Sequence, residues 1–383
     1  MPTLTDPFDL IDQTMQTGGS DAVFEMLAAT LRDEKKYPLL FEARVMKKRR
    51  DLGLPLIQTE SPGELPIEKQ RAYDEGFIAA AREVGGLFLA DGEISRAWPY
   101  FRAIGDPAPV AAAIEKVQAG EGVEPVIEIA FQEGVSPYKG FELILQHHGI
   151  CRAISSVDYF PARQGRDECV RLLVRTLHRD LVDSLKRTIA QNEAVPETEN
   201  ISELIAGREW LFGEYAYYVD TSHLVSILRY SIDLHDRESL QLALEMSDYG
   251  SHLSGQFSVR GDPPFENIYA DHAVYLRALL GQDEDAAIAH FRSKAAASNP
   301  EESGTVGAEV LVTLLARLKR YSEAVDASLE FISLSPGAQI TCPTVLQLCQ
   351  LAGDYAQLRK VARERGDIVS FAAAALQSHA LNN

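Results

Sequence analysis

Residues 85–109, GGLFLADGEISRAWPYFRAIGDPAP, and residues 319–336, KRYSEAVDASLEFISLSP, are two versions of one helix-turn-helix pattern. In both, a short polar turn precedes a helix-length segment with a small alanine, and a proline follows that alanine by twelve residues. The alanines are Ala97 and Ala324, and the prolines are Pro109 and Pro336. Because proline cannot continue a helix, the second helix of each pattern is predicted to end before it.

Small residues set the distance between the two helices of the first pattern. Gly85 and Ala97 let the backbones approach, while Phe88 and Phe101 fill the space toward the next helix pair. A helix pair of this kind has an apolar face that it can bury only against a neighbour. The sequence therefore predicts an array in which each helix pair packs on the next.

Two further turns have looser forms of this pattern, LLGQDEDAA around Gly281 and LAGDYAQL around Gly353. The intervals from Gly281 to Arg320 and from Arg320 to Gly353 are 39 and 33 residues, close to the ~34 residues of a tetratricopeptide unit. Over roughly residues 69–110 and 268–375, the chain resembles the tetratricopeptide-repeat superfamily. The resemblance implies an α-solenoid that binds peptides or partner proteins on a concave helical face, and some members of the superfamily carry grafted enzymatic sites.

The central part of the chain does not repeat the pattern. Across residues 166–192, apolar residues recur at intervals of three and four, which predicts one amphipathic helix longer than a repeat helix. Glycine and proline divide the neighbouring sequence into further helix-length segments. Only GQFSVRG, residues 255–261, has the character of a short extended segment.

We therefore expect an all-α protein, a tetratricopeptide-like α-solenoid of helical hairpins with an irregular helical central region. Residues 1–118 are predicted to form N-terminal hairpins that include one repeat-like unit. Residues 119–265 are predicted to form a His-rich helical region, and residues 266–383 to form C-terminal repeat-like hairpins.

Charge limits the classes of partner. The chain has 383 residues and a formal net charge of −19, and an acidic surface repels the phosphate backbone of nucleic acids. The one concentrated basic stretch, KKRR at residues 47–50, is at the predicted end of a helix that begins near Tyr37, where cations complement the helix dipole. We expect no nucleic-acid binding; the alternative is that this stretch binds a nucleic acid or another anionic ligand.

The sequence predicts neither a secretory signal nor a membrane-spanning helix. The start, MPTLTDPFDLIDQT, is acidic and lacks the basic residues and apolar run of a secretory signal. No window of about 20 apolar residues predicts a membrane-spanning helix. The four cysteines form no CxxC pair. The sequence predicts a reduced, cytoplasmic protein that does not associate with membranes.

Histidines are concentrated between residues 147 and 272. Neutral imidazoles and carboxylates are the usual ligands of zinc, iron and manganese. The candidate ligands of a divalent metal are His147, His148, His223, His252 and His272. The carboxylates nearby in sequence are Glu142, Asp158, Glu266 and Asp271. The spacing matches no HExxH, HxH or zinc-finger motif.

These histidines also have structural interpretations. His147 and His148 precede Gly149 and would complement the C-terminus of a helix. His272 is interpreted as a core residue that is hydrogen-bonded across a helix interface. Cys151, close to the histidine pair, is predicted to be a buried thiol rather than a nucleophile.

Aromatic residues gather in EWLFGEYAYYVD, residues 209–220. The candidate partner-binding residues are Trp210, Tyr215, Tyr217 and Tyr218. Such side chains offer a large contact area with a polar edge, and core packing against a flanking repeat is the alternative interpretation.

The expected function is recognition of a partner protein or peptide on a concave helical surface. One alternative is a metal-dependent hydrolytic or oxidative enzyme with a His and carboxylate site in the central helices. Another is a structural subunit of a larger assembly. No GxSxG, GxxxxGK[ST] or GxGxxG motif supports a different enzyme class.

Overall fold

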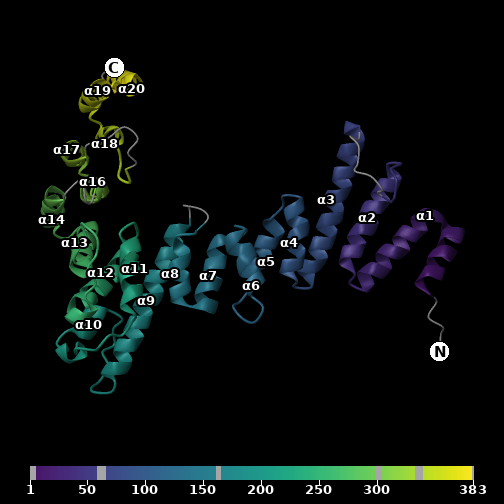
Figure 1. Cartoon of the computed structure of the whole chain (residues 1–383), viewed down its shortest axis with the longest axis horizontal. Coiled ribbons are helices and arrows are strands. Elements are labelled where there is room, and N and C mark those ends of the chain that lie inside the picture. The colour runs from purple at the N-terminus through teal and green to yellow at the C-terminus, as the bar shows by residue number, and fades with distance from the viewer. Residues whose placement is uncertain (1–5, 58–65, 161–164, 299–303, 333–339, 382–383) are drawn as a thin grey trace. The chain divides into compact units, whose positions relative to one another are not determined.

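A computed structural model describes residues 6–57, 66–160, 165–298, 304–332 and 340–381 (Figure 1). The structure is 72% helical and has no β-strand among these residues, so the all-α prediction is confirmed. The segment 255–261, expected to be extended, contains a 3₁₀ turn at Gly255–Phe257. Its extended character is limited to one β-bridge, between Arg260 and Asn267.

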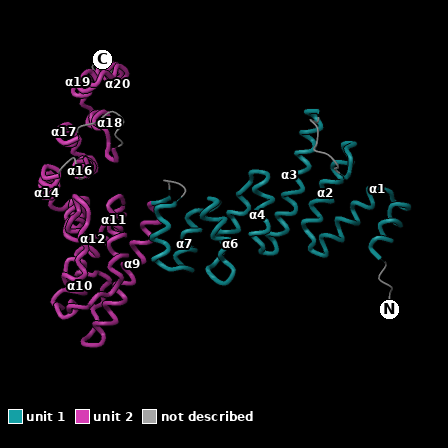
Figure 2. The backbone as a smooth tube through the Cα atoms, in the orientation of Figure 1, with its two compact units in different colours: residues 1–166 teal, residues 167–383 magenta. Residues whose placement is uncertain are grey.

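The chain folds into two compact units, residues 1–166 and residues 167–383 (Figure 2). The boundary falls at the start of α9 (Arg166–Ile189), the long amphipathic helix predicted from the sequence. This boundary lies inside the predicted central region, residues 119–265. The division of the chain into three parts stays a prediction.

The helices of unit 1 follow one another along the chain (Figure 1). They are α1 (Pro7–Asp33), α2 (Tyr37–Asp51), α3 (Ile67–Ala90), α4 (Ile94–Ala103), α5 (Ala108–Ile114), α6 (Glu124–Ile127) with the π-helical turn η1 (Glu128–Gln132), α7 (Pro137–His148) and α8 (Ile150–Val157). Each helix from α1 to α4 packs on the next, α6 packs on α4 and α7, and α7 packs on α8.

The pair α3 and α4 confirms the role of small residues in close packing. A Cβ atom at Gly85 would come within 2.6 Å of Cε2 of Phe101, so only glycine leaves room for that ring. Phe88, Ala97 and Phe101 are all buried. Gly92, in the turn between the helices, has a φ of 79°, a left-handed conformation that glycine adopts without steric cost.

The basic stretch 47–50 ends α2, which begins at Tyr37 as predicted. Lys47 forms an ion pair with Glu25 of α1, and Arg50 pairs with Asp21 of α1 at 2.6 Å. Acidic side chains of the neighbouring helix therefore compensate two of its four cations, and the stretch lies at a helix end as expected, although its residues are half-buried rather than fully solvated.

Unit 2 begins with a long helix and continues with shorter ones (Figure 1). After α9 come α10 (Ile201–Ile205), α11 (Thr221–Ser231), α12 (Arg237–His252), α13 (Ile268–Leu279), α14 (Glu284–Ala297), α16 (Val306–Arg317), α17 (Tyr321–Phe331), α18 (Val345–Ala352), α19 (Tyr355–Glu364) and α20 (Ile368–Leu381). From α12 to α20, each named helix packs on the next. Pro336, the proline of the second pattern, lies outside the described residues.

A buried polar cluster joins three helices at the start of unit 2. The carboxylate of Glu245 in α12 lies 2.9 Å from Nε2 of His178 in α9 and accepts hydrogen bonds from Asn200 Nδ2 at 2.7 Å and from the Ile201 N–H at 3.1 Å. Burial alone would raise the pKa of Glu245, but these hydrogen bonds outweigh it and lower that pKa. Glu245 is therefore held as a charged, fully bonded acceptor.

None of the helices in the described part of the chain combines the length and apolar character needed to cross a membrane.

Candidate functional site

His147 and His148 are the last two residues of α7, and both imidazoles are exposed. Gly149 separates α7 from α8 and has a φ of 81°, so the chain turns sharply after the second histidine. The predicted helix end is thus present. The two rings project from it with their centroids 4.7 Å apart.

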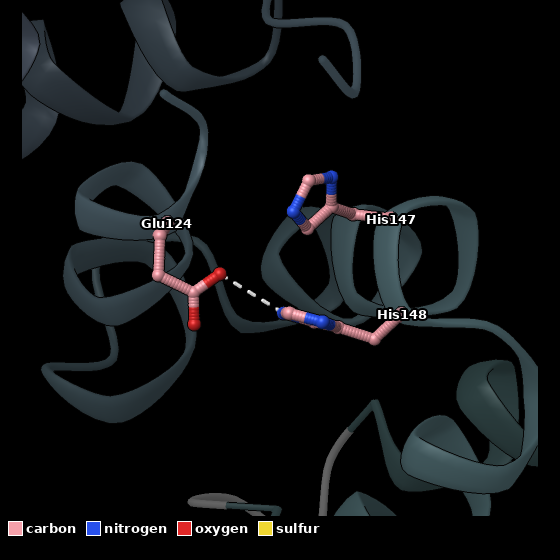
Figure 3. A group of neighbouring side chains, drawn as sticks. All are labelled: Glu124, His147 and His148. Carbon is pink, nitrogen blue, oxygen red and sulfur yellow. Dashed lines mark hydrogen bonds and ion pairs between the residues drawn. The ribbon is translucent and has the colours of Figure 1, made fainter. Parts of the chain in front are cut away.

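Glu124, the first residue of α6, completes a cluster with these histidines (Figure 3). Its Oε2 lies 2.9 Å from Nε2 of His148. One ligand atom from each of Glu124, His147 and His148 lies within 4.8 Å of the other two. Both imidazoles extend from the end of α7 toward the side occupied by Glu124.

A cleft of about 420 Å³ adjoins this cluster. Its apolar lining includes Ile127, Phe131 and Ile144, and its charged or ionisable lining includes Glu124, His148 and Arg152. Among the described residues, the Arg152 guanidinium takes part in no ion pair. The cleft therefore combines an apolar wall with a free cation beside the His and Glu cluster.

The carboxylates that the sequence suggested as metal ligands are engaged elsewhere. Glu142 pairs with Lys139 at 3.3 Å, and Asp158 lies 3.8 Å from Arg166. Glu266 pairs with Lys294, and Asp271 accepts from Lys294 and His290. Sequence reasoning missed Glu124, because a glutamate at the start of a four-residue helix has no periodicity that would distinguish it from the other acids.

The remaining candidate histidines lie in unit 2, whereas the residues of this cluster belong to unit 1. Among the described residues, no group of three or more such ligand atoms includes His223, His252 or His272. His252 is exposed, with Nδ1 2.9 Å from the Asp248 carbonyl oxygen, and its ring lies 5.1 Å from that of Phe212. The structure therefore places only His147 and His148 in a cluster that has metal-ligand character.

His272 is a core residue, as the structural interpretation predicted, but its hydrogen bond differs from the expected one. Nδ1 lies 2.7 Å from the Ile268 carbonyl oxygen of the same helix, so the bond does not cross a helix interface. Its Nε2 is buried and has no hydrogen-bond partner among the described residues. Burial lowers the pKa of His272 to about 4, which keeps the imidazole neutral.

Cys151 is exposed, so the prediction of a buried thiol was wrong. The buried face of α8 includes Ala153, Ile154 and Val157, and Cys151 lies on the other side of the helix. The apolar neighbour Ile150 suggested burial, but helix periodicity assigns the thiol to the solvent side.

The aromatic segment, residues 209–218, is a second candidate site. Trp210, Tyr215 and Tyr217 are 46%, 74% and 55% exposed, respectively. Tyr218 differs from them, because its phenol donates to the Leu211 carbonyl at 2.9 Å and its N–H donates to the Tyr249 hydroxyl at 3.0 Å. Tyr218 therefore fixes the segment, while Trp210, Tyr215 and Tyr217 remain exposed, with the Tyr217 ring centroid 5.2 Å from that of Phe257.

Two exposed carboxylates, Glu209 and Glu214, accompany these aromatic side chains. In the part of the chain that the structure describes, neither takes part in an ion pair. Glu209 and Phe212 also line a cleft of about 390 Å³ together with His252. The segment thus presents aromatic faces, unpaired negative charge and an adjoining cleft.

Comparisons of the chain with protein-family models, curated proteins and solved structures found no match.

Proposed function

We propose that this protein is a tetratricopeptide-like helical-repeat protein that binds a basic segment of a partner protein, and that the aromatic segment makes the contact. The observation that carries the proposal is the exposure of Trp210, Tyr215 and Tyr217 in a segment whose residues Glu209 and Glu214 are exposed too. Aromatic faces attract the guanidinium and ammonium groups of Arg and Lys, and unpaired carboxylates pair with them.

The helical architecture supports the repeat part of the proposal. From α12 onward each named helix packs on the next, and connections of two to four residues join α13 to α14, α16 to α17, α18 to α19 and α19 to α20. A helical pair of this kind buries one face against its neighbours and leaves the other free, which gives an extended surface for a peptide. The proposed arrangement is an α-solenoid whose aromatic contact residues lie in the connection between α10 and α11.

Charge determines which partner fits. With a net charge of −19, the chain attracts basic segments over a distance and repels acidic ones, so association with a basic peptide is accelerated at low salt. Specificity must come from the aromatic contacts, because long-range attraction acts on every basic peptide alike. The proposal therefore predicts that binding depends on the tyrosines and not only on the net charge.

A peptide titration tests this proposal. The probe is a nonapeptide of alternating Arg and Gly, added to the full chain at physiological ionic strength and detected by fluorescence anisotropy of a label on the peptide. The double variant Tyr215→Ala and Tyr217→Ala should weaken binding by about tenfold or more. Each exposed cation–π contact contributes about 0.5–1 kcal/mol, and packing of the aliphatic part of the Arg side chains on the rings adds to it.

Tyr159→Ala is the matched control, because Tyr159 is 81% exposed but lies in unit 1. It should leave the affinity unchanged, and a nonapeptide of alternating Glu and Gly should not bind. Equal binding by wild type and the Tyr215/Tyr217 double variant, or no binding of the Arg peptide by wild type, would refute the proposed contact.

A further inference from the structure

We propose that Glu124, His147 and His148 form a binding site for a divalent transition-metal ion, with zinc the best fit, and that this site takes an anionic ligand from the cleft beside Arg152. The site shares no residue with the proposed peptide contact, because its residues lie in unit 1 and the aromatic segment lies in unit 2. Each can therefore be tested without the other.

The donor atoms match the preference of zinc. Two imidazole nitrogens and one carboxylate oxygen form a common ligand set, with metal–ligand bonds of about 2.0–2.2 Å. Donor atoms around a tetrahedral ion are then about 3.3–3.6 Å apart, a distance that follows from those bond lengths. The three donor atoms already lie within 4.8 Å of one another, and exposed side chains can rotate to close the remaining gap.

Close backbone packing holds the helix that carries Glu124 against the helix that carries the two histidines. Gly140 of α7 packs so closely on η1 that a Cβ atom there would come within 2.7 Å of the Phe131 backbone nitrogen. Because η1 continues α6, this contact fixes the helix of Glu124 against the helix of the histidines. The 2.9 Å contact between Glu124 and His148 adds a side-chain link. Such pre-organisation lowers the entropic cost of assembling a metal site.

Three protein ligands leave a coordination position open for a further ligand. Glu124 and His148 both line the cleft, so a ligand in the cleft reaches the ion from that side. One carboxylate and two neutral imidazoles leave a divalent ion with a net positive charge, and the Arg152 guanidinium in the cleft lining adds another. An anion with carboxylate or phosphate oxygens fits this local charge in an otherwise acidic protein.

Other His and carboxylate groups are less suited to a metal. Asp271 contacts His290 through Oδ1, but its Oδ2 accepts from the Lys294 ammonium, which already occupies the place of a cation. His178 and Glu245 are buried, and the hydrogen bonds of the Glu245 carboxylate are already made within the protein. The cluster of Glu124, His147 and His148 is exposed and can exchange a metal with solvent.

Zinc titration of the full chain tests the site. The protein is treated with a chelator, the chelator is removed, and zinc is added in competition with a chromophoric chelator of known affinity. Wild type should bind one zinc ion per chain. Glu124→Gln and His148→Gln should each weaken binding by about tenfold or more, because loss of a ligand costs at least as much as loss of a residue that only orients one.

His252→Gln is the matched control, since His252 is an exposed histidine outside the cluster. It should bind zinc like the wild type, and circular dichroism should show unchanged helicity in all three variants. Absence of binding at micromolar zinc would overturn the site. Binding that Glu124→Gln leaves unchanged would also overturn it, because it would reveal adventitious binding by two neighbouring surface histidines.

Inorganic phosphate tests the anion. Added to the zinc-loaded protein in a calorimeter, phosphate should bind to wild type and bind several-fold more weakly to Arg152→Gln. The variant should retain its zinc, since Arg152 is not a ligand. Equal phosphate binding by wild type and Arg152→Gln, or none by either, would remove Arg152 and the anion from the proposal while the zinc titration still decides the metal site.

Discussion

The ring of Phe101 in α4 occupies the space that a side chain on Gly85 of α3 would need. A Cβ atom at Gly85 would lie 2.6 Å from Cε2 and 3.0 Å from Cδ2 of that ring. Both residues are buried, so the ring has little room to move away. The close approach of α3 and α4 thus depends on the absence of one methyl group.

Gly85→Ala should lower the free energy of unfolding by about 1–3 kcal/mol, because the added methyl group forces Phe101 or the helix to shift. Gly86→Ala is the matched control in the same helix, where a Cβ atom meets nothing within 4 Å. That change should stabilise the protein by about 0.5–1 kcal/mol, since alanine favours the helix over glycine. Urea unfolding followed by circular dichroism measures both, and equal effects would contradict the packing account.

Glu245→Ala should destabilise the protein by about 3–5 kcal/mol, since it leaves His178 and the Ile201 N–H without their buried partner. Glu238→Ala is a suitable comparison, because the Glu238 pair with Arg175 at 2.9 Å joins the same helices α9 and α12 at an exposed position. Its removal should cost at most about 1 kcal/mol. Similar losses in the two variants, measured by urea unfolding, would show that the buried cluster does not stabilise the contact between α9 and α12.

Acidification should weaken the fold through His272. Its pKa is about 4 in the folded chain, because burial disfavours the charged imidazole, and 6.5 is the reference value. The unfolded state therefore takes up the proton first as the pH falls. The contribution of His272 to the free energy of unfolding is fully present above about pH 6.5. It is lost progressively toward pH 4, and the loss amounts to about 3 kcal/mol.

Comparison of wild type with His272→Gln separates the pH dependence that His272 causes from the pH dependence that the many carboxylates of the chain cause. Nearby charges act in opposite directions on the His272 pKa, since Asp271 raises it and Arg229 lowers it. The stability difference between wild type and variant should change between pH 7 and pH 4 in favour of the variant. A difference independent of pH would show that His272 is not held neutral by burial.

Thiol chemistry distinguishes Cys151 from the other cysteines. Cys151 is exposed, whereas Cys169, Cys342 and Cys349 are buried. Burial raises the pKa of Cys342 to about 11 and also raises that of Cys349, which reduces their thiolate fraction. An aromatic disulfide reagent should therefore titrate one fast thiol in the native protein, and Cys151→Ser should remove it. Two or more fast thiols in wild type would contradict the burial of the other three.

Local patterns predicted the helices well, because their signals are contained in short stretches of chain. The helix expected to begin near Tyr37 and to end at the basic stretch is α2, Tyr37–Asp51, and the apolar spacing of residues 166–192 matched α9. Small residues also predicted the close approach of the two helices at Gly85, although Phe101, expected to fill the space toward the next helix pair, packs on Gly85 within the same pair. These features depend on residues that are close in sequence.

Pairings between distant residues could not be predicted in the same way. His178 and Glu245 are 67 residues apart, and neither has a local motif that indicates its partner. Glu124 and His148 are 24 residues apart, and the packing of α6 on α7 decides that this carboxylate, rather than Glu142, faces the histidine. One of many acids in an acidic chain becomes part of a candidate site only through the tertiary fold.

Hydrogen exchange of the full chain with and without the Arg and Gly nonapeptide tests the central claim, which is that the aromatic segment binds a basic partner. The account predicts that the peptide slows exchange at residues 209–218 and at the neighbouring end of α12, near His252. Exchange in unit 1 should not change, and the Tyr215/Tyr217 double variant should lose the effect. Protection elsewhere in the chain, or none at residues 209–218 at saturating peptide, would contradict the account.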